Sequence, residues 1–210
     1  MHNVFIILLL VPWIVKGQSI SPWQDGLLDI HHINTGSGNC TFFVFPDGTT
    51  MLLDAGDVDR SAKARINNPL KIAPRLPDST FSAAQSINEY LARISPAATQ
   101  IDYAVITHFH PDHYGAISPL SKTSHYGSYK LSGITEVHEY IPIKKLIDRN
   151  YPVYKYPVDI AKNNFDSATF SNYLIFIQHH LSRKSFSIEA LKAGSKTQIM
   201  LLHINKSIKW

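Results

Sequence analysis

The chain has 210 residues, of which 44% are hydrophobic and 17% are charged. These values suit one globular domain with an ordinary core, and they exclude a disordered or fibrous chain. The formal net charge is +4 with the histidines neutral. Lysine and arginine do not form a stripe interleaved with aromatic residues, so the sequence offers no dedicated nucleic-acid-binding face. The single cysteine, Cys40, excludes an internal disulfide.

The amino-terminal residues form a short apolar run from Val4 to Val15. This run is shorter than the ~20 residues that a membrane-spanning helix needs, and Pro12 interrupts it. Small residues at Val15 and Gly17 precede Gln18, a pattern typical of a signal-peptide cleavage site. We therefore expect a signal peptide over residues 1–17 and a secreted or extracytoplasmic domain over residues 18–210, periplasmic if the host is a bacterium. An uncleaved membrane anchor, which would make the chain a tethered binding module, is the alternative.

Three short strands are predicted next, over residues 28–33, 41–45 and 50–54. Pro46–Thr49 has the composition of a tight turn, so the second and third strands should form a hairpin. Gly36–Asn39 forms another turn, directly before Cys40. We expect Cys40 to be a small buried residue, because a nucleophilic thiol needs an activating base.

Apolar residues at three- and four-residue spacing predict a helix over residues 82–94, with Ser82 as its cap. A buried strand over 101–106 follows, and this strand–helix–strand order indicates a layered α/β domain. Later in the chain, the composition predicts a strand over 137–143, a helical turn over 144–149, a helix over 167–181 and a final strand over 198–204.

Four side chains that can bind metal follow the strand over 101–106: His108, His110, Asp112 and His113. Neutral imidazole and carboxylate are usual ligands for zinc-like ions. Residues i and i+2 of an extended segment point the same way, so His108 and His110 can address one ion. The turn after Pro111 lets Asp112 and His113 address a second ion nearby. Solvated surface histidines are the alternative, which four convergent ligands disfavour.

The segment Thr107–His113 resembles the hallmark motif of the metallo-β-lactamase superfamily. Residues 28–56, with their Gly-rich turn and Leu52-Leu53-Asp54-Ala55-Gly56, are similar to the lactamase-fold domain of DNA-uptake competence proteins. The resemblance implies an α/β fold in which two halves stack as an αββα sandwich. It also implies that Asp54 supports the metal ligands from behind, as carboxylates commonly do.

The same resemblance implies a hydrolase with two zinc ions. His108 and His110 would hold the first ion, while Asp112 and His113 would hold the second, and Asp112 would also orient the nucleophile. Metal-activated hydroxide would attack an ester, amide or phosphodiester bond of a small-molecule or phosphodiester substrate. The similarity to competence proteins favours a phosphodiester.

The sequence departs from the superfamily in its second half, which normally supplies a further His, a bridging Asp and a last His. Asp159, Asp166 and His203 do not match those motifs convincingly. We therefore expect the sandwich to be incomplete at its carboxyl end and the metal ligands to form half-sites. The alternative to a hydrolase is a non-catalytic, truncated remnant or interaction domain that binds metal weakly.

Overall fold

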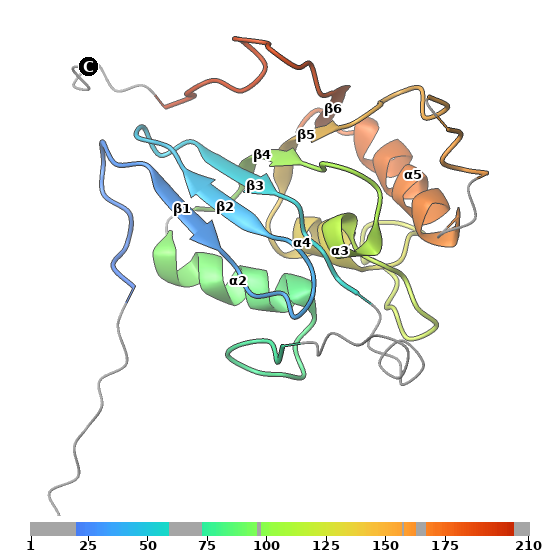
Figure 1. Ribbon diagram of the computed structural model, residues 1–210, viewed down its shortest axis with the longest axis horizontal. Helices are drawn as coiled ribbons and strands as arrows, with labels where there is room; N and C mark the ends of the chain where they lie inside the picture. Colours follow the sequence, from blue (N-terminus) through green and yellow to red (C-terminus); the bar gives the residue numbers. More distant parts are fainter. Residues whose placement is uncertain (1–19, 59–72, 96–97, 157, 163–166, 204–210) are drawn as a thin grey trace, which may run out of the picture.

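The computed structural model describes residues 20–58, 73–95, 98–156, 158–162 and 167–203 (Figure 1). At its centre lies one mixed sheet with the strand order β1-β2-β3-β4-β5-β6. The strands are β1 (Asp29–His32), β2 (Thr41–Val44), β3 (Thr50–Leu53), β4 (Ile101–Val105), β5 (Ile143–Asp148) and β6 (Ser187–Ala190). The strands predicted over 28–33, 41–45, 50–54 and 101–106 are therefore confirmed, each within two residues at either end.

The sheet changes from antiparallel to parallel at β3. Strands β1, β2 and β3 pair antiparallel, whereas β3, β4, β5 and β6 run parallel to one another. The predicted hairpin is confirmed, because the Phe45 amide donates to the Thr49 carbonyl at 2.8 Å across the turn. Parallel strands end at the same edge of a sheet, and the register pairs Leu53 with Val105. The residues that follow β3 and β4 therefore leave the sheet side by side.

One face of the sheet is covered by α2 (Ala83–Ile94), α4 (Gly133–Tyr140) and α5 (Ser167–Leu181), while the short α3 (Pro111–Tyr114) lies at its edge (Figure 1). Helix α2 begins as predicted, because Ser82 and Gln85 cap each other's backbone amides. Alternate strand residues such as Leu52, Ala104 and Leu146 are fully buried under these helices. Helix α5 has the predicted bounds, and its Phe170, Tyr173 and Phe176 complete the core. Cys40 is buried as expected, and burial raises the pKa of its thiol.

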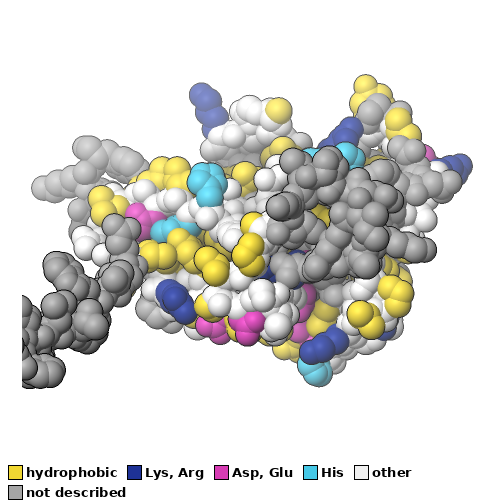
Figure 2. All heavy atoms as spheres, turned by 60° about the horizontal axis from the view of Figure 1, so that its bottom comes forward, with side chains coloured by type: hydrophobic (Ala, Val, Ile, Leu, Met, Phe, Trp, Pro, Cys, Tyr) yellow, Lys and Arg dark blue, Asp and Glu magenta, His cyan; other side chains and the backbone are white. Residues whose placement is uncertain are grey.

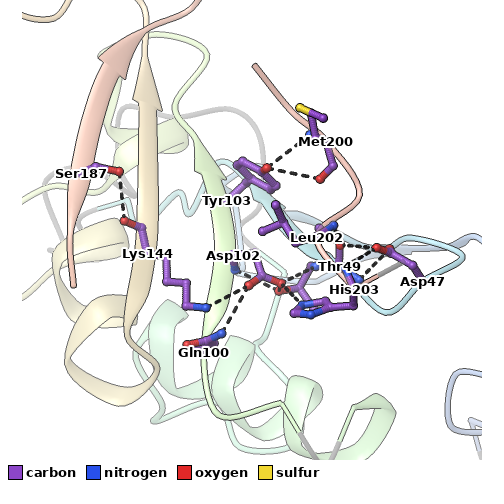
Figure 3. Close-up of polar contacts among 11 residues, drawn as sticks. Asp47, Thr49, Gln100, Asp102, Tyr103, Lys144, Ser187, Met200, Leu202 and His203 are labelled. Atoms are coloured by element: carbon purple, nitrogen blue, oxygen red, sulfur yellow. Dashed lines mark hydrogen bonds and ion pairs between the residues drawn. The ribbon is translucent and has the colours of Figure 1, made fainter. Parts of the chain in front are cut away.

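The opposite face carries a smaller apolar cluster of Tyr103, Val105 and Ile147. An extended segment, residues 198–203, crosses this face (Figure 3). Tyr103 donates its hydroxyl to the Met200 carbonyl at 3.2 Å, and the Leu202 amide donates to Thr49 Oγ1 at 2.7 Å. Because these contacts join backbone to side chains, the segment lies on the face and does not extend the sheet.

Three predictions about the later elements are wrong. Residues 137–143 are not one strand, because Ser132 and Thr135 form a capping box that starts α4, which includes residues 137–140 and buries Ile134 and Val137 on one side, and β5 begins only at Ile143. Residues 144–149 are not a helical turn, because Leu146 and Ile147 pair with β4 in β5. Residues 198–204 are not a strand in their described part, 198–203, because this segment contacts the sheet through bonds between backbone and side chains.

The arrangement is compatible with the α/β lactamase fold, since helices cover one face of a mixed sheet. The predicted signal peptide, residues 1–17, lies outside the described residues. Within the described ranges, no helix is both long enough and apolar enough to cross a bilayer.

Candidate metal centre

The residues predicted to bind metal lie at the edge where β3 and β4 end. Strand β4 is buried along its whole length and finishes at Val105. The chain then leaves the sheet through Thr107 and begins α3 at Pro111, the first residue of that helix. Asp54 follows β3 at the same edge, and its amide donates to the Val105 carbonyl at 2.9 Å. A backbone hydrogen bond therefore joins the two segments independently of their side chains.

Asp54 lies behind the histidines, as the sequence predicted. Its side chain is almost fully buried, and its φ of 60° is unusual for a residue other than glycine. The carboxylate accepts the Thr107 amide at 2.9 Å and the Thr107 hydroxyl at 2.8 Å. Its Oδ2 also lies 2.7 Å from Nδ1 of His113. A carboxylate here keeps the proton of His113 on Nδ1, so the lone pair of Nε2 points away from Asp54.

The three histidines and Asp112 form two close pairs of donor atoms. Nε2 of His108 lies 3.1 Å from Nδ1 of His110. Nε2 of His113 lies 3.6 Å from Oδ2 of Asp112. The pairs adjoin, because the ring centroids of His108 and His113 are 3.8 Å apart. Burial lowers the pKa of His108, as do the neighbouring His113 and His110, so this imidazole is neutral, the form that binds metal.

Tetrahedral zinc requires a particular distance between its donor atoms. Two nitrogen donors on one tetrahedral zinc, each about 2.0–2.1 Å from the ion, are about 3.3 Å apart. The spacings of both pairs are close to that value, so the chemistry and the distances fit one ion for each pair. Within the described residues, no group of three or more His, Cys, Asp or Glu side chains is placed to hold a metal ion. Each ion would therefore receive two donors from this part of the chain.

The remaining residue of the loop, Phe109, faces the opposite way and anchors it. Its ring packs against Tyr114, Tyr154, Phe170 and Tyr173 at centroid distances of 5.1–5.7 Å. Tyr154 and Tyr173 in turn donate their hydroxyls to the buried carboxylate of Asp148, at the end of β5. Alternation along an extended segment thus directs Phe109 into the core and His108 and His110 outward.

A family model of the metallo-beta-lactamase superfamily matches residues 33–180. The chain belongs to this superfamily. The matched range contains Asp54, the four residues of the two donor pairs, all of α2, α3 and α4, and α5 as far as His180. Membership in the metallo-beta-lactamase superfamily indicates a metal-dependent hydrolase, and its members typically bind metal ions, often zinc. No curated protein matches the chain.

The structure brings all five predicted residues of this metallo-beta-lactamase domain together, while their role as ligands stays a prediction. The other histidines that a sequence search would consider lie elsewhere. His180 is buried beside Tyr129 in the helical layer. His203 contacts Asp102 near the amino end of β4 (Figure 3). This is the end opposite to residues 107–113, which we call the metal loop.

Sequence reasoning missed two features of the metallo-beta-lactamase domain. The side chain of Asn39, from the turn between β1 and β2, lies against His113. A cavity of about 690 Å³ lies behind the loop after β3, and its lining includes Asp57, Arg75 and Glu136. No local pattern marked either feature, because both depend on contacts between distant segments. The donor pairs are not among the described residues that line this cavity, so it is separate from the metal centre.

Proposed function

We propose that this protein is a zinc-dependent hydrolase that cleaves phosphodiester bonds outside the cytoplasm. The observation that carries this proposal is the position of two donor pairs side by side at the end of β4, with His113 oriented by Asp54. Two adjacent metal ions are the usual means of clamping the attacking and leaving oxygens in phosphoryl chemistry.

The residues would divide the work as follows. His108 would bind one ion through Nε2 and His110 through Nδ1, while His113 Nε2 and Asp112 Oδ2 would bind the other. Bound zinc lowers the pKa of water to about 7 and polarises an oxygen of the substrate. The Asp112 side chain is 45% exposed, so its carboxylate can reach an attacking water and accept its proton. Asp54 would hold the proton on His113 Nδ1 throughout.

Two features of the chain bear on the substrate class. The resemblance to competence proteins that we infer from the sequence of residues 28–56 favours a phosphodiester over an ester or amide. On the face seen in Figure 2, the Lys and Arg side chains of the described residues stand apart from one another. This scatter agrees with the sequence, in which lysine and arginine form no stripe interleaved with aromatic residues, and it favours a small phosphodiester over a long nucleic acid.

Metal stoichiometry tests the two pairs directly. Zinc would be titrated calorimetrically into chelator-treated protein, and bound metal would be counted by mass spectrometry. We expect about two equivalents for the native protein. We expect about one for His108→Ala/His110→Ala and about one for Asp112→Ala/His113→Ala, because each double substitution removes the donors of one ion.

His125→Ala is the matched control, because the imidazole of His125 is 90% exposed and pairs with Glu139 away from the metal loop. It should still bind two equivalents. Equal stoichiometry in the native protein and both double variants would contradict the assignment.

Hydrolysis of bis(p-nitrophenyl) phosphate and p-nitrophenyl acetate then decides the function. Two bound ions with no turnover of either ester would favour the second candidate, a domain that binds metal without catalysis, which the two-donor pairs also support.

Export is a separate part of the proposal, supported by the apolar run that ends near Gly17. We expect the protein recovered from outside the cytoplasm to begin at Gln18, because residues 1–17 would be removed during secretion. Mass spectrometry of the intact secreted chain checks this. Recovery of a membrane-bound form that still begins at Met1 would rule it out.

A further inference from the structure

The turn between β1 and β2 is pressed against the metal loop. A Cβ added to Gly38 would lie 2.6 Å from backbone atoms of Gly56. A Cβ added to Gly56 would overlap the backbone carbonyl of Asp112. Atoms this close cannot accommodate a side chain, so glycine is required at both positions. The close approach brings the turn within reach of the predicted ligands.

Asn39 is the residue of this turn that joins the segment after β3 to the metal loop. Its amide donates to the Asp112 carbonyl at 2.7 Å, and its carbonyl accepts the Gly56 amide at 3.0 Å. The backbone of Asn39 thus bridges the segment after β3, which carries Asp54, and the metal loop. These bonds place its side chain beside the donor pair of Asp112 and His113.

The carboxamide of Asn39 points at one particular atom of the site. Its Nδ2 lies 3.1 Å from Nε2 of His113. Because the proton of His113 is on Nδ1, facing Asp54, Nε2 has a free lone pair that accepts an N–H of Asn39. Nε2 is also the atom proposed to bind the second ion. The amide therefore occupies, in this structure, the lone pair that a metal would take.

We propose that Asn39 is a further residue of the metal centre, a neutral donor for an anionic oxygen of the substrate. This inference rests on the proposed function. An ion about 2 Å from Nε2 of His113 would lie too close to Nδ2 of Asn39, which is 3.1 Å from the same atom, so the carboxamide would have to turn aside when His113 binds an ion. The backbone bonds of Asn39 would still keep the residue beside the pair. Turned aside and without their acceptor on His113, its N–H groups would be able to donate to a charged oxygen of a phosphodiester bound beside the ion. Preorganised amide donors stabilise the charge that develops there, and losing one commonly costs 10²–10³-fold in kcat.

The test uses Asn39→Ala, with Asn34→Ala as the matched control. Asn34 belongs to the same turn, but among the described residues its side chain hydrogen-bonds to backbone atoms, the Pro74 carbonyl and the Gly36 amide. In the metal-free protein, the ¹⁵N resonance of His113 Nε2 should shift in Asn39→Ala and stay in place in Asn34→Ala. Zinc affinity should be unchanged or up to about fivefold tighter in Asn39→Ala, because the lone pair no longer has a competitor.

The zinc-loaded proteins then separate a donor from a structural residue. Inorganic phosphate should bind about tenfold more weakly to Asn39→Ala than to the native protein, and kcat for bis(p-nitrophenyl) phosphate should fall about 10²-fold with KM little changed. If the native protein shows no turnover, the proposed function is wrong. The ¹⁵N shift and the phosphate affinity would still test whether Asn39 is a donor in the metal centre. An unmoved His113 resonance, unchanged phosphate affinity, or zinc affinity weakened more than tenfold would overturn the inference.

Discussion

Gly56→Ala should lower the free energy of unfolding by about 3 kcal/mol or more, near the upper end for overpacked sites. The new methyl group would overlap the Asp112 carbonyl and lie 2.7 Å from the Cα of Gly38. Both obstacles are backbone, so neither can rotate away. The turn, the segment after β3 and the metal loop would have to separate, and zinc affinity should fall more than tenfold. Urea denaturation and zinc calorimetry measure the two effects.

The matched control for this substitution is Gly127→Ala. A Cβ at Gly127 would lie 2.8 Å from the His179 ring, which is the partly exposed end of a side chain and can move. Its cost should stay below about 1 kcal/mol, with zinc binding unchanged. A Gly56→Ala protein as stable as Gly127→Ala, with native zinc affinity, would show that the metal loop does not need this close contact.

The cluster at the end of β4 could be predicted from sequence because its information is local. His108, His110, Asp112 and His113 lie within six residues, and the apolar run before them indicates a buried strand that delivers them. Helices α2 and α5 were equally accessible, because their apolar residues recur at helical spacing over twelve and fifteen residues.

The elements that sequence reasoning missed depend on tertiary contacts. Residues 137–143 include three β-branched side chains, Val137, Ile141 and Ile143, so they resemble a strand, yet a cap at Ser132 directs most of them into α4. Lys144 and Lys145 make β5 look amphipathic, but its pairing with β4 buries Leu146 and Ile147. Asn39 and His113 are separated by 74 positions, so their contact leaves no local pattern.

A second large effect is expected from pH, through two histidines buried in the helical layer. His138 of α4 and His180 of α5 have ring centroids 4.2 Å apart, and each is less than a tenth exposed. Burial lowers the pKa of His138 to about 3 and that of His180 to about 4. The Ile143 amide donates to Nδ1 of His138 at 3.1 Å, so protonation there would also remove an acceptor.

The two histidines therefore stay neutral in the folded state at pH values below 6.5, the ordinary histidine pKa, where they become protonated in the unfolded chain. Stability from the neutral pair is present above pH 6.5 and falls as the pH drops from there toward 4. Between pH 7.5 and pH 5, each histidine should cost about 2 kcal/mol, or about 4 kcal/mol together. Urea denaturation of the metal-free protein at the two pH values measures this loss.

His138→Asn/His180→Gln isolates the pair, because the amide oxygen of Asn can accept the Ile143 amide and Gln can reach the Tyr129 hydroxyl that His180 contacts at 2.8 Å. The charged neighbours Glu139 and Arg183 and the imidazole of His179 remain in this variant, as do the histidines of the metal loop. They contribute equally to both proteins, so the difference in pH dependence belongs to the buried pair. A variant that loses as much stability at pH 5 as the native protein would contradict the assignment. The imidazole of His125 is 90% exposed, so His125→Ala should show the same pH dependence of stability as the native protein.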